Sequence, residues 1–415
     1  MNQAPTYTAP VVILRSGHHG GLGIARSLGR LGAPVYCLDA DRWEPAFSSR
    51  YCRRRFVLKP EGDTNEGLVA QLLEIGGKLG CRPILIPTTD EGAIWVAAHT
   101  AVLEPLFRFP IQDAALVSVL CDKGRMQELA RQHGVPTAQS AIPTSRFDVL
   151  RFLDVATFPV MLKATNAAKL RSRLGGTKFV VQSRSELLDL YTKAEDHGVC
   201  DFLLQEFIPG EDWMFDGYFD RCSRCLFGIT GKKLRRFPVE TGVTSLGICL
   251  RNEVVEQTTI RFMQAIGYRG ILDIGYRFDR RDGKYKLLDV NPRIGCTFRL
   301  FVAADGMDVA RALYLDLTEQ PVTSSRAAEG RKWVVEDFDS ISAFRCWHKH
   351  NLTLMDWVKS FRGLEETACF ALDDPLPFFL LPIADCCELY RWIRNRFMVS
   401  RRNGSVIPET GHTAS

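Results

Sequence analysis

The chain lacks a strong net charge, a long hydrophobic run and an obvious secretion signal. Its 53 lysines and arginines against 48 aspartates and glutamates leave a formal charge of +5 over 415 residues, which gives no whole-chain signal for nucleic-acid binding. No stretch reaches the ~18 uninterrupted apolar residues that a membrane helix requires. Residues 1–10 lack the basic and apolar regions of a signal peptide. We therefore expect a cytoplasmic protein.

A complete zinc-ligand pattern is also missing. The 13 cysteines are scattered, and among them the pair Cys222 and Cys225 has metal-ligand spacing without a second such pair to complete a site. One CxxC motif is a weak zinc signal. We expect free thiols in a reducing cytosol, with a zinc site as the alternative.

What the chain does contain is typical of a globular α/β protein. Its residues are 46% hydrophobic and 24% charged, and its length predicts two or three lobes. Near the N-terminus, an apolar run at 11–15 precedes a glycine cluster, a helical pattern and a second apolar run at 34–40. A helical stretch at 66–79 and a run at 83–87 follow. This alternation predicts a small α/β lobe over the first 115 residues or so.

The middle of the chain predicts strands and helices around a basic loop. We expect a helix over 121–134, strands over 158–163, 179–182 and 202–207, and a helix over 186–194 preceded by capping serines. Residues 208–212 read as a turn and 164–178 as a loop. The clearest hairpin has strands at 271–278 and 284–290, joined through Asp282-Gly283. Residues 320–332 read as a polar linker, and we see no internal repeat.

The segment 287–295, LLDVNPRIG, is the most informative for chemistry. Side chains alternate along a strand, so Asp289 and Asn291 share one face. Pro292 ends the strand and Arg293 follows. A carboxylate and an amide oxygen suit a hard cation such as Mg²⁺, and an arginine suits a phosphate or carboxylate. A strand end that merely carries polar residues is the alternative for this segment taken by itself.

Six segments in order resemble the ATP-grasp superfamily, and more closely its bacterial carboxylate–amine ligase branch. The resemblance covers residues 10–315 and rests on GLGIARSLGR with PVYCLDA, LIPTTDEG, CDKGRMQELARQHGVP, FPVMLK, LLQEFIPGED and DGKYKLLDVNPR. It implies an α/β fold: a Rossmann-like N-terminal domain at 1–118, a two-part ATP-grasp nucleotide-binding and catalytic domain at 119–320 and a C-terminal extension at 321–403. We expect residues 404–415 to form a disordered tail.

The resemblance also implies roles for individual residues, with ATP and Mg²⁺ as cofactors. Lys123 and Lys163 would meet the nucleotide phosphates, and a lysine that ends an apolar strand wants an anionic partner. A core-edge or surface lysine is the alternative. Gln205 would begin the hinge of the nucleotide site, Glu206 would meet the adenine amino group, and the backbone at Phe207 and Ile208 would read the ring. Asp212 would hold the ribose hydroxyls, although a strand end before a Pro-Gly turn is a serious rival interpretation.

The loop 164–178 would be the phosphate lid. It has fewer glycines than family lids and more basic residues, namely Lys169, Arg171, Arg173 and Lys178. We expect it to clamp phosphates by charge, with Lys178 among the nucleotide-binding residues. A solvated basic loop is the alternative.

One position departs from the family pattern and puts catalysis in doubt. The family's first acidic metal ligand falls, by alignment to the hairpin turn, on Gly275. Asp273 lies two residues earlier on the same strand face, so we assign the metal to Asp273, Asp289 and Asn291. Asp289 stands where most relatives have glutamate. A shorter carboxylate and a missing one would weaken or alter metal binding.

The glycine cluster at Gly17, Gly20, Gly21 and Gly23 precedes a strand that ends with Asp39, an arrangement similar to a dinucleotide fingerprint. The spacing is not GxGxxG. In ATP-grasp ligases this lobe faces the substrate, which would place His18 and His19 beside it. An ordinary turn between strand and helix is the other interpretation.

The predicted function is ATP-dependent ligation of a carboxylate to an amine through an acyl phosphate, with release of ADP and phosphate. Lys163 and Arg293 would be the catalytic residues, and small-molecule carboxylate and amine substrates the partners, without nucleic acid. Two rivals remain: a non-catalytic ATP-binding protein, favoured by Gly275, and an NAD(P)-dependent oxidoreductase built on the N-terminal lobe. Residues 374–402 combine an apolar run with basic residues, which allows peripheral membrane or protein contact as well as packing on the protein's own core.

Overall fold

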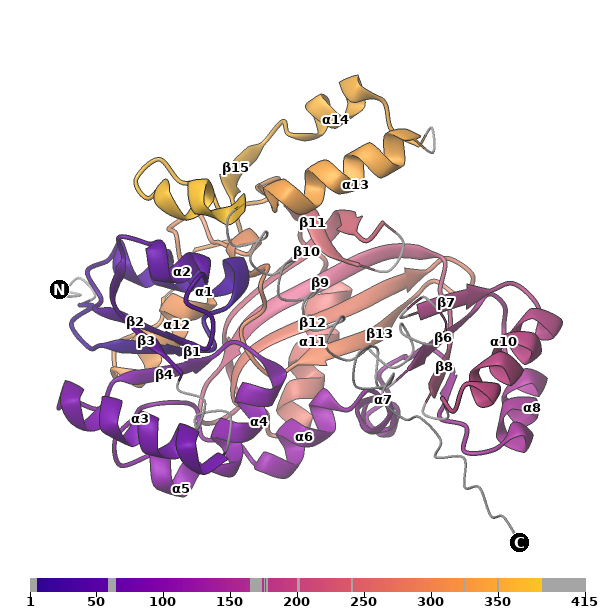
Figure 1. The fold of residues 1–415 in the computed structure, drawn as a ribbon, viewed down its shortest axis with the longest axis horizontal. Helices are drawn as coiled ribbons and strands as arrows, with labels where there is room; N and C mark the ends of the chain where they lie inside the picture. Colours follow the sequence, from indigo (N-terminus) through magenta and orange to yellow (C-terminus); the bar gives the residue numbers. More distant parts are fainter. Residues whose placement is uncertain are drawn as a thin grey trace, which may run out of the picture.

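The computed structural model describes residues 6–58, 65–164, 174, 176, 178–199, 202–239, 242–323, 325–348 and 351–382. Within these residues three sheets follow one another along the molecule (Figure 1). The first and third are small and four-stranded, and the second has seven strands. The expected α/β class is therefore confirmed.

The N-terminal lobe is a parallel sheet of order β3-β2-β1-β4 flanked by helices. Its apolar strands are buried, as parallel strands covered on both faces must be. The expected strand–helix–strand unit at its start is present. The elements are β1 (Val11–Leu14), α1 (His18–Gly29), β2 (Val35–Asp39), α2 (Pro45–Ser48), β3 (Cys52–Val57), α3 (Asn65–Leu79), β4 (Ile84–Pro87), α4 (Asp90–Ala98) and α5 (Thr100–Leu103).

Two helices connect this lobe to the rest, where we expected one over 121–134. They are α6 (Ala114–Cys121) and α7 (Lys123–Gln132). The helix is interrupted between them at Asp122, whose backbone is extended. The Asp122 side chain caps α7 by accepting a hydrogen bond of 2.9 Å from the Arg125 amide. This break places Lys123 at the first position of α7.

The small lobe is an antiparallel sheet of order β5-β8-β6-β7 covered by two helices. Its strands and helices have a hydrophobic core of their own, formed by residues such as Val149, Leu162, Leu187 and Phe202. Its elements are β5 (Ser140–Ala141), α8 (Arg146–Val155), β6 (Val160–Ala164), β7 (Lys178–Val181), α10 (Arg184–Asp196) and β8 (Phe202–Glu206). The three strands and the helix predicted here are confirmed. Most of the expected lid, including Lys169, Arg171 and Arg173, lies outside the described residues.

The large sheet has the strand order β13-β12-β9-β10-β11-β14-β15. The predicted hairpin is its edge pair, and the expected turn at 208–212 is wrong in part because β9 already begins at Gly210. Its elements are β9 (Gly210–Phe219), β10 (Cys225–Phe237), β11 (Val243–Cys249), α11 (Glu253–Ala265), β12 (Gly270–Asp279), β13 (Lys284–Asn291), η2 (Phe298–Leu300), α12 (Val309–Leu317), β14 (Lys332–Val334), α13 (Glu336–His348), α14 (Leu354–Ser360) and β15 (Leu364–Thr367).

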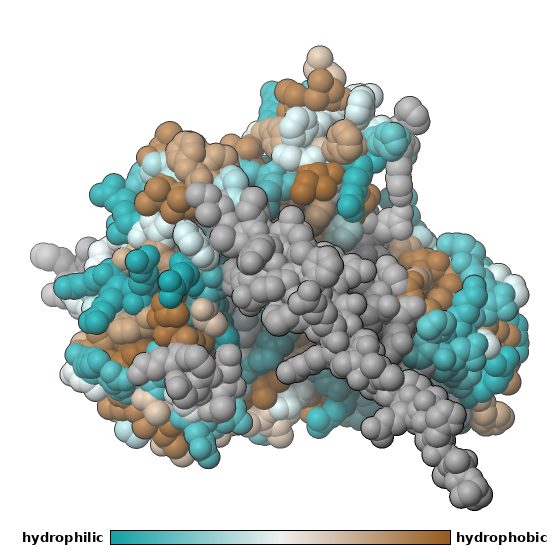
Figure 2. Space-filling model, in the orientation of Figure 1, coloured by the Kyte–Doolittle hydropathy of each residue, from teal (hydrophilic) through white to brown (hydrophobic). Residues whose placement is uncertain are grey.

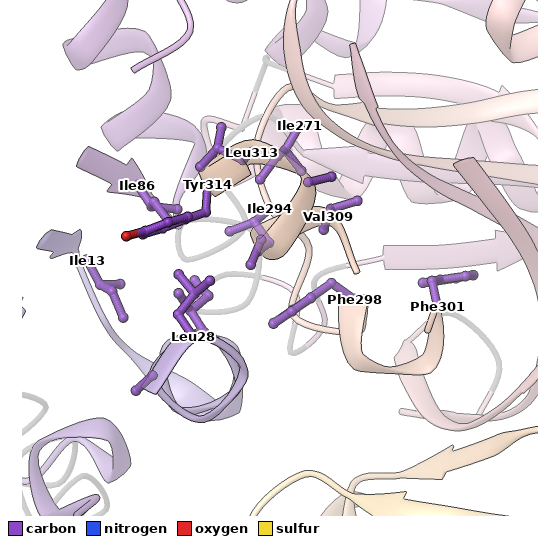
Figure 3. Packing of buried hydrophobic residues seen from close by; sticks show 14 of the residues in the cluster. Ile13, Leu28, Ile86, Ile271, Ile294, Phe298, Phe301, Val309, Leu313 and Tyr314 are labelled. Carbon is purple, nitrogen blue, oxygen red and sulfur yellow. The ribbon is translucent and has the colours of Figure 1, made fainter. Parts of the chain in front are cut away.

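One hydrophobic core joins the N-terminal lobe to the large sheet. Ile13, Leu28 and Ile86 of the lobe share it with Ile271 of β12 and with Phe298, Phe301, Val309 and Leu313 from the η2–α12 segment. Figure 3 shows these side chains converging between the N-terminal lobe and the η2–α12 segment. Burial of this size in one contiguous cluster makes the lobe and the sheet a single packed unit.

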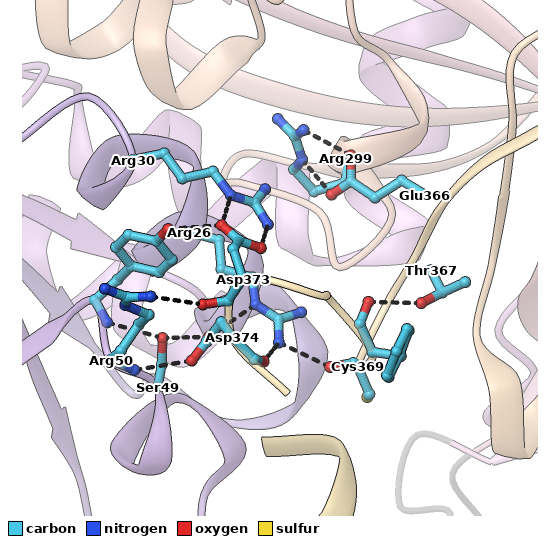
Figure 4. A network of polar contacts seen from close by, with 12 residues as sticks. Arg26, Arg30, Ser49, Arg50, Arg299, Glu366, Thr367, Cys369, Asp373 and Asp374 are labelled. Atoms are coloured by element: carbon cyan, nitrogen blue, oxygen red, sulfur yellow. Dashed lines mark hydrogen bonds and ion pairs between the residues drawn. The ribbon is translucent and has the colours of Figure 1, made fainter. Parts of the chain in front are cut away.

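The C-terminal part of the chain is built into both of these bodies. β14 and β15 extend the large sheet across the domain boundary that we expected at residue 320. Beyond β15, Asp374 accepts hydrogen bonds from Arg26 Nε (2.9 Å), Ser49 Oγ (2.7 Å) and the Arg50 amide (2.9 Å) (Figure 4). Since Arg26 and Asp374 are both buried, this ion pair fastens the extension to the N-terminal lobe.

Candidate functional site

A single cavity of about 410 Å³ lies between the small sheet and the large sheet. Most of the predicted nucleotide-binding and metal residues line it, namely Lys123, Lys163, Lys178, Gln205, Glu206, Phe207, Ile208, Asp212 and Asp289. Gly275 lines it too. Residues from well-separated stretches of the chain thus meet around one space of ligand size.

Three lysines converge at one side of this cavity. Lys163 is the next-to-last residue of β6 and is paired across the sheet with Lys178, the first residue of β7. The Lys163 Nζ donates a hydrogen bond of 2.7 Å to Gln205 Oε1. Burial, together with the charges of Lys123 and Lys178, lowers the pKa of Lys163 to about 7. The pKa of Lys178 is lowered as well, mainly by burial and then by Lys123. Such a concentration of ammonium groups favours a polyanionic ligand.

Asp289 offers these lysines one carboxylate. Its Oδ1 lies 3.5 Å from Lys123 Nζ, and both side chains are nearly half exposed. Lys123 thus has a carboxylate partner at the side of the cavity where the lysines converge.

The hinge residues lie in the wall of the cavity, but two of their carboxylates already have protein partners. Glu206, buried at the end of β8, lies 2.6 Å from Arg281 NH2. Asp212 lies within β9 and contacts Arg277 Nε at 2.6 Å and Arg236 NH1 at 2.7 Å. A ligand hydroxyl or amine reaching these side chains would share them with arginine. The backbone here is also engaged in part, because the Phe207 amide donates to the Pro159 carbonyl and the Ile208 carbonyl accepts from Arg277.

The structure adds cavity residues that the sequence patterns did not indicate. Met161, Trp213, Tyr276 and Leu288 provide apolar walls, and Lys233 of β10 and Arg277 of β12 add positive charge. Arg277 also lies over the Phe207 ring, with its guanidinium carbon 5.4 Å from the ring centroid. We expected no strand over 225–237, and the adjacent Lys232 and Lys233 gave no signal that separates the residue facing the cavity from its neighbour.

The predicted metal ligands lie along one face of the large sheet. In the β12–β13 hairpin Gly275 is paired with Asp289, and Asp273 with Asn291. The Asn291 Nδ2 donates a hydrogen bond of 3.2 Å to Asp273 Oδ2. Among the described residues, and apart from its chain neighbours, a Cβ atom added at Gly275 would have no atom within 4 Å. The register therefore supports Gly275 as the position opposite Asp289, and the room for a side chain there is open.

The donor set is compatible with a hard divalent cation. Asp273, Asp289 and Asn291 offer carboxylate and amide oxygens, the ligand type that Mg²⁺ prefers. Among the residues that the structure describes, no group of three or more histidine, cysteine, aspartate or glutamate side chains is placed to hold a metal. Asn291 and the nucleotide phosphates would therefore have to complete the coordination.

Arg293 lies outside the cavity wall, beyond the metal-ligand positions. Its Nε donates a hydrogen bond of 2.7 Å to Asp90 Oδ1 at the start of α4, and its NH2 donates one of 3.4 Å to Asn291 Oδ1. The side chain thus links the sheet to the N-terminal lobe. A substrate carboxylate that met Arg293 would approach from this junction between the lobes and would compete with Asp90.

The glycine cluster serves close packing in this structure. Gly20, Gly21 and Gly23 lie within α1. A Cβ at Gly20 would lie 3.3 Å from Cys296, and one at Gly23 would lie 2.9 Å from the Phe298 ring. The missing side chains thus let α1 approach the segment after β13. The ring of His19 lies 5.5 Å from that of Trp333, on the side of the C-terminal extension. The side chain of His18 is not among those that the structure describes.

The CxxC pair lies at the turn between β9 and β10. Cys222 and Cys225 are both free thiols, and Cys225 Sγ donates to the Phe227 carbonyl at 3.2 Å. Asp220 caps the turn by accepting from the Cys222 and Arg224 amides. These local bonds account for the turn by themselves.

Comparison with known proteins agrees with this geometry. No protein-family model matches the chain. The chain is 25% identical over 269 residues to a D-aspartate ligase of Enterococcus faecium (strain Aus0004), an alignment over 60% of this chain and 64% of that protein. The match thus spans somewhat less than two thirds of that relative's length.

Solved structures with the same architecture extend the comparison. An N5-carboxyaminoimidazole synthetase from Staphylococcus aureus, solved with ADP, has a TM-score of 0.60 at 13% identity and covers 80% of this chain and 82% of its own. An L-amino acid ligase from Bacillus licheniformis has a TM-score of 0.54 at 14% identity over 78% of this chain and 79% of its own. The chain therefore has the ATP-grasp fold that these solved structures share.

Proposed function

We propose that the protein is an ATP-dependent ligase that joins a carboxylate to an amine through an acyl phosphate and releases ADP and phosphate. The observation that carries the proposal is the shared cavity, in which Lys123, Lys163 and Lys178 face Asp289 beside the apolar walls at Met161 and Leu288. This combination suits a purine nucleotide with its phosphates directed toward the lysines. The named activities of the two ligases similar to this chain support the reaction type.

The residues act mainly by positioning and by charge. Lys123 and Lys163 would hold the phosphate oxygens, and Asp289, Asn291 and Asp273 would hold Mg²⁺, which when bound would neutralise phosphate charge. The substrate carboxylate attacks the γ-phosphorus and ADP leaves. The amine then attacks the acyl carbon, loses a proton, and phosphate departs. Arg293, at the lobe junction, would orient the carboxylate.

The substrates would be small molecules, a carboxylic acid and an amine, and aspartate is the first acid to test because the Enterococcus relative is named for D-aspartate. We also propose a cytoplasmic location. In the described part of the chain, no helix is long and apolar enough to cross a membrane.

A contact with a membrane surface or another protein also remains a prediction. The segment from 383 onward lies outside the description, but the extension carries further exposed apolar side chains, including Phe344, Trp347 and Leu354. Hydrophobic residues gather over α13 and α14 in Figure 2.

Trapping of the acyl phosphate tests the proposed reaction. The full-length protein is incubated with ATP, Mg²⁺, hydroxylamine and each of a panel of D- and L-amino acids and dicarboxylic acids. A ligase will form a hydroxamate with its own acid and release ADP in equal amount. Lys163→Met should form neither product, and the surface variant Lys193→Met should match the wild type.

A non-catalytic ATP-binding protein is the second candidate, because Gly275 removes a carboxylate that the fold normally supplies to the metal. Binding of a non-hydrolysable ATP analogue, measured by calorimetry with and without Mg²⁺, separates the two. A ligase will bind the analogue more tightly with Mg²⁺. A binding protein that has lost turnover will bind it equally well in either condition and release no ADP with any acid.

A further inference from the structure

A second row of acidic and amide side chains crosses the large sheet next to the row that contains Gly275. Asp216 of β9 is paired with Asp273 of β12, and Asp273 is paired in turn with Asn291 of β13. The next row toward the nucleotide cavity is Met214, Gly275 and Asp289. Because side chains two residues apart share a face, both rows point to the same side of the sheet.

Asp216 is the unusual member of this row. Its side chain is 0% exposed. In the described part of the chain, neither of its carboxylate oxygens has a hydrogen-bond partner. A buried carboxylate without a donor is strongly unfavourable unless it is neutralised or binds a cation. Most buried aspartates of this protein do have partners: Asp279 contacts Arg281 and Lys286, and Asp374 contacts Arg26.

The surroundings of Asp216 supply oxygens, and the guanidinium of Arg293 already has other partners. Asp273 accepts a hydrogen bond from Asn291, and Gly295 packs directly against the Asp273 carboxylate. The guanidinium of Arg293 is bonded to Asp90 and Asn291. Neighbouring strands are about 4.8 Å apart, and hard cations bind oxygens at roughly 2.0–2.6 Å. A cation between adjacent side chains of the row can therefore contact both.

We propose that Asp216, Asp273 and Asn291 form a site for a hard divalent cation, Mg²⁺ or Mn²⁺, one row farther from the nucleotide than Gly275. The carboxylate of Asp216 would replace the one that is missing at Gly275, at a position nearer to the lobe junction. Only the role of this cation in the reaction rests on the proposed function, because the row can bind a cation whether or not the protein is a ligase.

Mn²⁺ binding, measured by the loss of the free-ion electron paramagnetic resonance signal, tests the site directly. The full-length protein is titrated first with Mn²⁺ alone and then with Mn²⁺ and a non-hydrolysable ATP analogue. Asp216→Asn keeps the shape of the side chain and removes its charge, and should weaken Mn²⁺ binding about tenfold or more, within the range found when supporting groups of metal sites are lost. Asp273→Asn should do the same.

Two further variants make the test specific. Asp316→Asn changes an aspartate that accepts a hydrogen bond of 2.6 Å from Tyr218 Oη and should leave Mn²⁺ affinity unchanged. Gly275→Asp, added to Asp216→Asn, places a carboxylate opposite Asp289 in the open space found there and should recover Mn²⁺ affinity in the presence of the nucleotide.

The outcomes separate this inference from the proposed function. Unchanged Mn²⁺ affinity in Asp216→Asn and Asp273→Asn overturns the inference. Failure of the wild type to bind the nucleotide while Asp216→Asn still loses Mn²⁺ would overturn the proposed function and leave the cation site standing. A circular dichroism spectrum and a thermal unfolding transition equal to those of the wild type show that a variant is folded.

Discussion

Nucleotide binding should take up a proton at Lys163 when the pH is at or above neutrality. Without a ligand, burial and the charges of Lys123 and Lys178 lower the pKa of Lys163 to about 7. Phosphate oxygens beside the amine favour its charged form and raise its pKa toward the ordinary value for lysine. Binding therefore converts a partly neutral amine to an ammonium group.

The sign and the size of the effect follow from these two pKa values. A group whose pKa rises on binding strengthens binding fully below its unbound pKa, and the gain is lost as the pH rises through the bound value. With an unbound pKa of about 7, about 0.9 proton should be taken up per site at pH 8 and about 0.1 at pH 6. Affinity should fall about tenfold, or ~1.4 kcal/mol, for each pH unit above 7.

Calorimetry measures this uptake directly. A non-hydrolysable ATP analogue is titrated at pH 8, where its phosphates are already ionised, in two buffers that differ in ionisation enthalpy. The difference in observed heat gives the number of protons. Lys163→Met keeps the apolar stem without the amine and should abolish most of the uptake, whereas Lys193→Met on α10 should retain it. Equal uptake in wild type and Lys163→Met would refute the assignment of the proton to Lys163.

Three further predictions concern the metal position and the buried ion pair. Asp289→Ala should remove the Mg²⁺ dependence of nucleotide binding and abolish ADP release. It should have little effect on thermal unfolding, because the side chain is 43% exposed. Asp282→Ala in the hairpin turn is the control, and a fully active Asp289→Ala would contradict the metal assignment. Asp374→Ala should destabilise the protein by about 3–5 kcal/mol, measured by urea unfolding, because it leaves Arg26 buried without its carboxylate. Asp373→Ala removes a more exposed partner of Arg30 and should cost no more than about 1 kcal/mol; equal losses in these two variants would show that burial is not the deciding factor.

Hydrophobic spacing, turn residues and helix caps in the sequence predicted several elements of the fold correctly. The strand–helix–strand unit of the N-terminal lobe, the β12–β13 hairpin with its Asp282-Gly283 turn, and the helix capped at Ser183 all carry such signals. The lysines and Asp289 were expected in one site on the basis of the resemblance, and they line one cavity. Their individual roles stay predictions until binding is measured.

The strands β9 to β11 escaped prediction because their pattern is mixed. β10 carries Lys232, Lys233, Arg235 and Arg236, since this end of the strand reaches the cavity and its rim instead of a hydrophobic core. A run that is half apolar and half basic does not resemble either a buried strand or an amphipathic one.

Long-range ion pairs were equally invisible in the sequence. Arg293 meets Asp90, and Asp212 meets Arg277 and Arg236, across separations that no local pattern encodes. The membership of β14 and β15 in the large sheet is of the same kind. The sequence shows that these side chains are charged, but only the tertiary structure shows which ion-pair partners they have.

The shared core of the N-terminal lobe and the large sheet has a mechanical consequence. Those two bodies are also fastened by the Asp374 ion pair, whereas the small lobe has its own core and meets the sheet across the cavity. We therefore expect the small lobe to move relative to the N-terminal lobe and the large sheet when a ligand enters. We expect such a motion to leave the junction around Arg293 undisturbed.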